Sequence, residues 1–184
     1  MSHLNNNKWI YLSLLGFFVV VYFFAQYALG YGESGIQQYI FDHQPFITAE
    51  NIRLGLYQLG SEGVLYYSNM YLSGLDFLYP LSFCLFGFLV IDKATSDARK
   101  YRVLLLAPPV LFTADSIENL IILSILQAYP EQAWGYAYLG YTVAVKTGVK
   151  WLLYAIVLAS LYCLAAHKFN KSSKKDAQTT RASS

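Results

Sequence analysis

The chain has 184 residues, of which 56% are hydrophobic and only 13% are charged. A soluble domain carries about 25% charged residues, so this composition excludes an ordinary water-soluble protein. The formal net charge of +2 is too small to predict a nucleic-acid partner. The lipid bilayer is therefore the partner that the composition predicts.

Four apolar runs are long enough to cross a hydrocarbon core of about 30 Å, which takes about 20 helical residues. They cover residues 9–29, 71–91, 103–127 and 139–166. In lipid these runs must satisfy their own backbone hydrogen bonds, so we expect helices. The predicted fold class is all-α: a polytopic membrane protein with a four-helix transmembrane bundle over residues 1–169. The first run exceeds the apolar stretch of about 7–15 residues in a signal peptide, so we expect it to be retained.

Basic residues alternate between the loops and set the predicted orientation. The segment between the second and third runs is basic, as is the chain after His167, whereas residues 30–70 contain only one basic residue, Arg53. Cytoplasmic loops carry an excess of Lys and Arg, so both termini are predicted to be cytoplasmic, in a multi-pass protein of the plasma (inner) membrane. Residues 170–184 are predicted to be a disordered basic tail lying against anionic lipid heads.

The outer segment 30–70 is too long for a simple linker and is predicted to contain one or two short interfacial helices. Thr48 suits a helix cap, and Gly60 followed by Ser61 suits the end of one helix and the start of another. Tyrosines are dense here: Tyr31, Tyr39, Tyr57, Tyr66, Tyr67 and Tyr71. Two interpretations stay open, an aromatic belt at the headgroup level and a lid over a cavity between the helices.

Ionisable residues inside the apolar runs are the strongest functional signal. Each costs at least about 2.5–3.5 kcal/mol at the bilayer centre if it faces lipid, so such residues are expected to face inward and pair. Spacings of three and four residues place the acids of the third run on one helix face and the lysines of the fourth run on another. The predicted ligand-binding residues are Asp76, Asp115, Glu118, Asn119, Lys146 and Lys150.

Depth brings the same residues together. At about 1.5 Å of rise per residue, and with neighbouring runs crossing in opposite directions, all of these residues fall in the outer half of the bilayer. The inner half is almost wholly apolar, so a polar pocket that opens outward is predicted. Three carboxylates against two lysines leave one excess negative charge, which a proton or a cation can balance.

Motifs for cofactors and common catalytic centres are absent from the sequence. The two cysteines lie in apolar runs, and the three histidines lie outside the runs or at their ends. Haem pairs, zinc spacings, phosphate-binding loops and nucleophile elbows do not occur. We therefore expect no cofactor and no metal site, and leave open whether the protein is an enzyme.

Two short motifs carry a resemblance to known proteins. The segment G-L-D-F-L-Y-P at 74–80, followed by D-S-I-E-N at 115–119 and a lysine-bearing run, is similar to a group of uncharacterised bacterial four-span membrane proteins. That resemblance implies no activity. The chain also resembles the four-span sterol-isomerase and sigma-2-receptor-like domain, whose membrane-embedded acids hold a cationic amine or a carbocation-like intermediate. The D-x-x-E-N placement and the two lysines depart from that pattern.

Three functions follow from these features and stay open. The first is binding or transport of a small amphipathic molecule, a lipid headgroup or an ion by the charged cluster. The second is a structural or accessory subunit whose ion pairs fix helix packing, within a homo-oligomer or a larger membrane complex. The third is an intramembrane lipid or sterol-like isomerase that uses carboxyl acid–base chemistry.

Overall fold

The computed structural model describes residues 6–34, 41, 44–96 and 99–182. Every regular element in this part of the chain is helical, which confirms the predicted all-α fold class. The α-helices are α1 (Asn6–Ser34), α2 (Ala49–Leu72), α3 (Leu75–Ala94), α4 (Ala107–Ala128) and α5 (Leu139–Ala182), and the 3-10 helices are η3 (Arg99–Leu106) and η4 (Trp134–Ala137).

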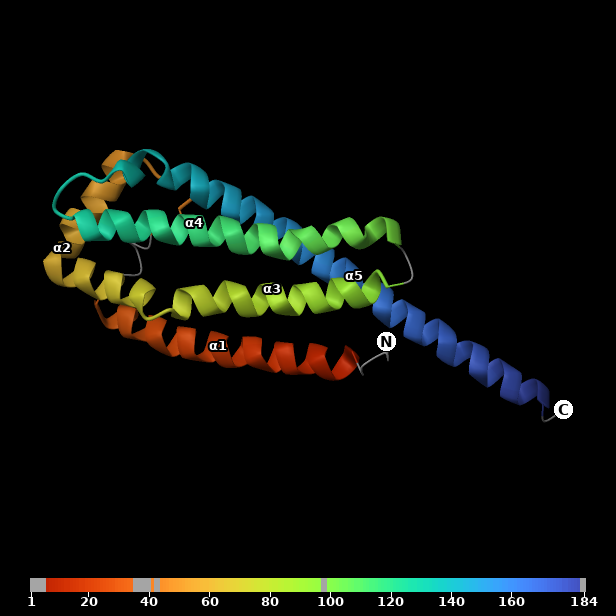
Figure 1. Cartoon of the computed structure of the whole chain (residues 1–184). Coiled ribbons are helices and arrows are strands. Elements are labelled where there is room, and N and C mark those ends of the chain that lie inside the picture. Colours follow the sequence, from red (N-terminus) through yellow and green to blue (C-terminus); the bar gives the residue numbers. More distant parts are fainter. Residues whose placement is uncertain (1–5, 35–40, 42–43, 97–98, 183–184) are drawn as a thin grey trace.

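Four of the helices form an elongated bundle. Figure 1 shows α1, α3, α4 and α5 running along its length, each antiparallel to the one before it, with α2 across one end. Helix α3 contacts α1, α4 and α5. The beginning of α1 and the far part of α5 both lie at the end opposite α2, as an even number of crossings requires.

Three helical stretches of the described chain are long and apolar enough to span a membrane, within Ala49–Ala94, Lys100–Ala128 and Leu139–His167. Helix α1 adds a shorter apolar stretch, Lys8–Phe23. It packs along α3 through Phe17, whose ring centroid lies 5.6 Å from that of Phe83. The protein is therefore an all-helical membrane bundle, and α1 is the predicted fourth crossing.

The α-helices of the second and third crossings begin later than the hydropathy pattern predicts. Helix α3 starts at Leu75 rather than at residue 71, because Gly74 at φ +77° separates it from α2. Residues 103–106 belong to η3, and Pro108 and Pro109 stand in the first turn of α4. Proline is tolerated there because that turn has no intrahelical acceptor for its missing N–H. These two prolines start α4 instead of kinking it.

The carboxyl-terminal segment differs from the sequence prediction. Helix α5 continues past the apolar run to Ala182, so residues 170–182, predicted to be disordered, are helical in the structure. After Gly148 the chain contains no glycine or proline, and residues 170–182 include three Lys and two Ala beside two Ser and two Thr. Because no helix breaker follows, the helix propagates beyond the bilayer-sized part.

Within the segment predicted to hold interfacial helices, the chain from Ala49 onward folds as α2, at one end of the bundle. Thr48 caps it, since its hydroxyl accepts a hydrogen bond of 3.2 Å from the Asn51 N–H. Gly60 at φ +65° and ψ 179° divides α2 into two short helices, as predicted. Tyr39 and its neighbours at 35–40 and 42–43 lie outside the described residues.

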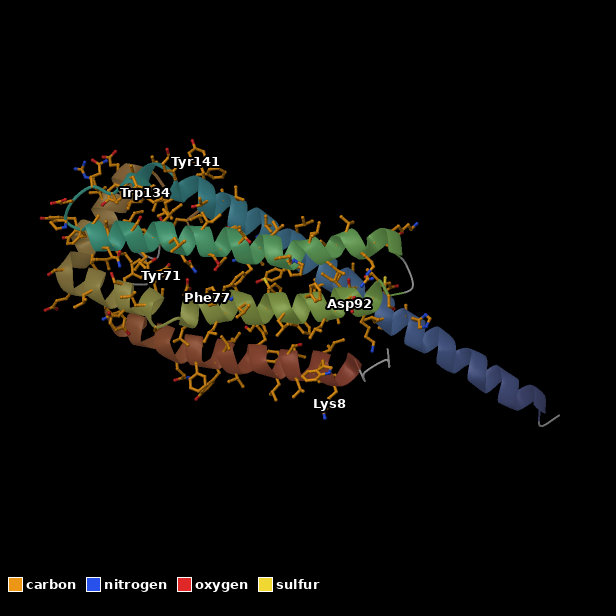
Figure 2. The ribbon with its side chains drawn as sticks, viewed as in Figure 1. Lys8, Tyr71, Phe77, Asp92, Trp134 and Tyr141 are labelled. Carbon is orange, nitrogen blue, oxygen red and sulfur yellow. The ribbon has the colours of Figure 1, made fainter. Side chains whose placement is uncertain are left out.

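Aromatic side chains project outward at the α2 end of the bundle. Figure 2 shows Trp134 and Tyr141 there, whereas Lys8 and Asp92 lie toward the opposite end. Tyr57, Trp134 and Tyr141 are 81%, 65% and 69% exposed. Amphipathic aromatic rings favour the membrane–water interface, so this end has the character of an aromatic belt.

The buried apolar side chains form two separate cores. The α2-side core joins α2, α4, η4 and α5, and the far-side core joins α3, α4 and α5. The α2-side core includes Ile52, Leu56, Tyr67, Ile121, Ile122, Ile125, Leu139 and Val143. The far-side core consists of Cys84, Phe86, Val90, Ile91, Leu111, Leu153 and Val157.

Candidate functional site

A polar layer lies between the two apolar cores. On α4, Leu111 belongs to the far-side core and Ile121 to the α2-side core, and the acids of the D-S-I-E-N segment lie between them. On α5, Val143 and Leu153 bracket Lys146 in the same way. We use the term polar layer for Asp115, Glu118, Asn119 and Lys146. The interruption of the core at one level of two antiparallel helices brings these side chains together.

Lys146 connects the two helices through the acids of α4. Its Nζ lies 2.7 Å from Glu118 Oε1 and 3.9 Å from Asp115 Oδ1. Asn119 Nδ2 donates a hydrogen bond of 3.2 Å to Asp115 Oδ2. The sequence correctly predicts that an acid of the third run pairs with a lysine of the fourth.

Burial differs sharply among these charged groups. The Glu118 side chain is 0% exposed and the Lys146 side chain 6%, whereas the Asp115 side chain is 16% exposed. A buried charge is tolerated only when an opposite charge and hydrogen bonds offset its lost hydration. Lys146 and Glu118 therefore depend on each other, and Asp115 is the more exposed of the two acids.

Asp76 lies in the first turn of α3 and is also buried, at 9% exposure. Its neighbour Phe77 packs against Phe112, with 4.9 Å between the ring centroids. Phe112 is one helical turn before Asp115, so the first turn of α3 lies beside the part of α4 that carries the polar layer. The helical turn that carries Asp76 therefore lies beside the layer.

Lys150 departs from the predicted arrangement. It is half-buried one turn beyond Lys146, and it forms no salt bridge with any residue that the structure describes. A spacing of four residues keeps two side chains on one face but separates them by about 6 Å along the helix axis. The acids of α4 lie level with Lys146. Lys150 therefore lies one helical turn away from them, toward the far-side core.

The charge balance of the polar layer defines its chemistry. Two carboxylates, from Asp115 and Glu118, face one ammonium, from Lys146. In a medium of low dielectric constant an excess negative charge strongly favours a proton or a cation as a partner. The arrangement therefore suits a positively charged guest, an ion or a transferable proton more than an anion.

The lid interpretation of the outer segment is supported only in part. Helix α2 does border a cavity, of about 490 Å³, at its end of the bundle. None of the residues of the polar layer lines this particular cavity. Residues of α2 and of the chain around η4 form its walls, so the cavity is a separate place on the molecule.

Metal coordination gets no support from the described part of the chain. No group of three or more His, Cys, Asp or Glu side chains there is placed to hold a metal ion. Asp115 and Glu118 instead use a lysine as their cation.

Comparisons with known proteins leave the site to be interpreted on its own geometry. No protein-family model matches the chain, and neither the curated proteins nor the solved structures contain a match to it. The fold and the site define a class: an all-helical membrane bundle with a buried Lys146–Glu118 ion pair.

Proposed function

We propose that this protein binds or transports a small amphipathic molecule, a lipid headgroup or an ion through a positively charged group held at the polar layer. The observation that carries the proposal is one lysine, Lys146, shared by the carboxylates of Asp115 and Glu118 between two apolar cores. A guest cation would add a second positive group beside these two carboxylates.

Asp115 is the residue that supports binding over a purely structural role. Its contact with Lys146 is 3.9 Å, beyond hydrogen-bond length, and it is the more exposed of the two acids. A guest ammonium group beside Asp115 would gain a charge-assisted hydrogen bond without breaking the 2.7 Å contact between Lys146 and Glu118. The apolar surroundings would then hold the hydrocarbon part of an amphipathic molecule.

A cationic amphiphile should stabilise the protein in a manner that requires Asp115. We expect hexylammonium chloride to raise the melting temperature of the full chain in a neutral detergent saturably, by about 5 °C at a hundred times its dissociation constant. Sodium hexanoate, with a chain of similar length and the opposite charge, should give no such shift. If the guest is a small ion, NaCl should raise the melting temperature more than choline chloride does at the same concentration.

The matched variants for this measurement are Asp115→Asn and Asp92→Asn. Both convert a carboxylate to an amide, but Asp92 lies far from the polar layer and pairs with Arg102 at 3.1 Å. Asp115→Asn should abolish the shift with hexylammonium, and Asp92→Asn should keep it. Equal shifts with hexylammonium and hexanoate, or an unaltered response of Asp115→Asn, would count against a cation site.

A structural or accessory role is the second candidate, and the full burial of Glu118 favours it. A fully buried ion pair can fix the register of two helices without binding anything. In that case the cationic amphiphile would have no selective effect, and the protein would act with a larger membrane partner.

We also propose that the protein lies in the plasma (inner) membrane with both termini on the cytoplasmic side. This orientation is supported by the basic residues after His167 and in the segment that begins at Asp92. Green fluorescent protein fused after Ser184 should fluoresce in a bacterial host, and alkaline phosphatase fused there should be inactive. Phosphatase inserted at Gln132 should be active. The reverse pattern would invert the topology and move the polar layer to the cytoplasmic half.

The resemblance to uncharacterised bacterial four-span proteins stays a prediction beside this proposal. It rests on the segments at 74–80 and 115–119, which in this structure begin α3 and form the acidic part of α4. Both segments thus contribute to the polar layer or its immediate surroundings.

A further inference from the structure

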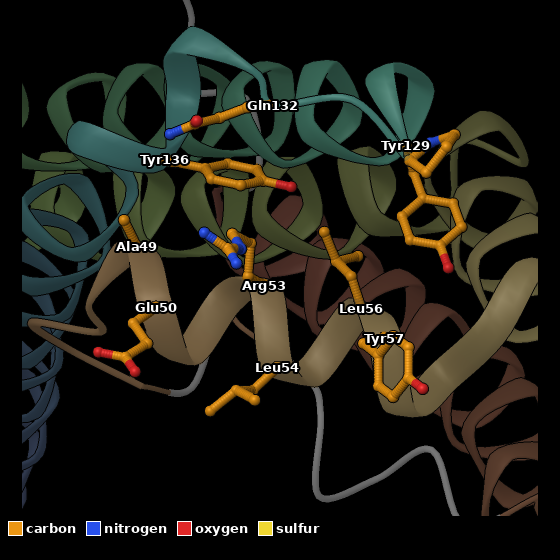
Figure 3. A pocket seen from close by; sticks show the side chains of 10 residues that line it. Ala49, Glu50, Arg53, Leu54, Leu56, Tyr57, Tyr129, Gln132 and Tyr136 are labelled. Carbon is orange, nitrogen blue, oxygen red and sulfur yellow. The ribbon is translucent and has the colours of Figure 1, made fainter.

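The cavity of about 490 Å³ at the α2 end of the bundle has a polar and aromatic lining. Helix α2 contributes Glu50, Arg53 and Tyr57 to it, and the chain around η4 contributes Tyr129, Gln132 and Tyr136 (Figure 3). This volume falls in the range of small-molecule sites, about 300–1,000 Å³, and far exceeds the volume that a single ion needs.

Arg53 projects into the middle of this cavity. Figure 3 shows its guanidinium between α2 and the ring of Tyr136. Burial raises the pKa of Tyr136, and the charge of Arg53 beside it acts in the opposite direction, so the two groups are electrostatic neighbours. Arg53 is also the only Lys or Arg between positions 30 and 70. An anion that enters the cavity therefore meets one dominant positive group.

Glu50 supplies the opposite charge one helical turn before Arg53. Residues three apart lie about 5–6 Å apart at their Cβ atoms on a helix. Neither side chain forms a salt bridge with another residue of the described chain, so the two charges do not neutralise each other by direct contact. The cavity wall thus presents a separated positive and negative group.

These groups match a ligand that carries both charges. An arginine fork recognises phosphate or carboxylate oxygens through paired hydrogen bonds. A carboxylate and tyrosine rings hold an ammonium group, by charge and by cation–π attraction. A ligand with only a negative charge would be attracted by Arg53 but repelled by Glu50.

The position of the cavity indicates that such a ligand comes from the bilayer. Leu54 and Tyr57 on α2 are 53% and 81% exposed, and Trp134, at the start of η4, is 65% exposed. Apolar and aromatic side chains at the end of a membrane bundle favour the headgroup region. A phospholipid could place its headgroup in the cavity while its acyl chains stay in lipid.

We infer that this cavity binds the zwitterionic phosphate–amine headgroup of a phospholipid, with the phosphate at Arg53 and the ammonium at Glu50 and the tyrosines. The site is independent of the polar layer, so the inference does not rest on the proposed function. A free molecule of the same chemistry would use the same groups, and the experiment must distinguish these two sources.

The test measures binding of three probes to the full chain in a neutral detergent by native mass spectrometry. Dihexanoyl-phosphatidylethanolamine has both charges and short acyl chains, dihexanoyl-phosphatidylglycerol has only the phosphate charge, and free phosphoethanolamine lacks the chains. We expect the ethanolamine lipid to bind most tightly. Arg53→Gln should weaken its binding by about tenfold or more, since one charge-assisted contact is lost. Arg102→Gln, at the far end of the bundle, should leave it unchanged.

The second variant, Glu50→Gln, tests the ammonium subsite. It should weaken binding of the ethanolamine lipid and strengthen binding of the glycerol lipid. The difference between the two affinities should therefore become smaller. Binding of free phosphoethanolamine as tight as that of the lipid would support the zwitterion site and assign it to a soluble ligand. Equal affinity of wild type for the two lipids, or equal effects of Arg53→Gln and Arg102→Gln, would overturn the inference.

Discussion

Lys146→Met should destabilise the protein by about 3–5 kcal/mol, the usual cost of removing one partner from a buried ion pair. The substitution keeps most of the side-chain volume but leaves the carboxylate of Glu118, which is 0% exposed, without the ammonium 2.7 Å from it. Asp115 loses the same cation. The free energy of unfolding in a neutral detergent, from a denaturant titration, measures the effect.

The control for this prediction is the double variant Lys146→Met with Glu118→Met. Replacing a buried pair by apolar groups of similar size is often neutral or stabilising, so most of the lost stability should return. Lys150→Met should cost much less than Lys146→Met, since Lys150 is half-buried and has no salt bridge among the described residues. A double variant as unstable as the single one would show that packing, and not an unpaired charge, causes the loss.

The same double variant separates the two candidate functions. If the polar layer binds a cation, the double variant should fold but lose its melting-temperature response to hexylammonium. If the pair of Lys146 and Glu118 only fixes helix register, wild type and double variant should both lack a selective response. Recovery of stability and loss of binding are thus measured on one protein.

The sequence predicts the bundle well because lipid demands intrahelical hydrogen bonds and long apolar runs. It also predicts that acids of the third run meet a lysine of the fourth, because helices that alternate in direction place residues at computable depths. It does not distinguish Lys146 from Lys150, because a spacing of four residues shows only that both lysines lie on one helix face. Which lysine lies level with the acids depends on how α4 packs against α5. That these groups bind a ligand stays a prediction.

Other features depend on contacts between segments distant in sequence. Arg53 is only a topology signal in the sequence, and its place in a cavity arises because η4 folds back over α2. Helix ends follow local chemistry that hydropathy does not resolve. Pro108 starts α4 inside the apolar run, and α5 continues to Ala182 because no glycine or proline follows Gly148.

Gly140→Ala and Gly148→Ala, two identical substitutions on α5, should have effects of opposite sign. A Cβ at Gly140 would lie 2.5 Å from the carbonyl oxygen of Ile47, a backbone atom that cannot rotate away. The Phe46 N–H also donates a hydrogen bond of 2.9 Å to the Gly140 carbonyl, and Phe46 adopts φ +63° at this contact. We expect Gly140→Ala to cost about 1–3 kcal/mol, as overpacking usually does.

Gly148→Ala meets no atom within 4 Å, so only the helix propensity changes. Alanine is favoured over glycine inside a helix by about 1 kcal/mol, and this variant should be more stable than wild type. Thermal unfolding of both variants in one detergent gives the comparison. Equal shifts of the same sign would contradict the close approach at Gly140.

The contact at Gly140 also bears on the headgroup site. Ile47 directly precedes the Thr48 cap, where α2 begins, and α2 carries Arg53 into the cavity. A displaced Ile47 should move the start of α2 relative to η4 and change the cavity between them. Gly140→Ala should therefore weaken binding of dihexanoyl-phosphatidylethanolamine, whereas Gly148→Ala should leave it intact, although neither residue lines the cavity.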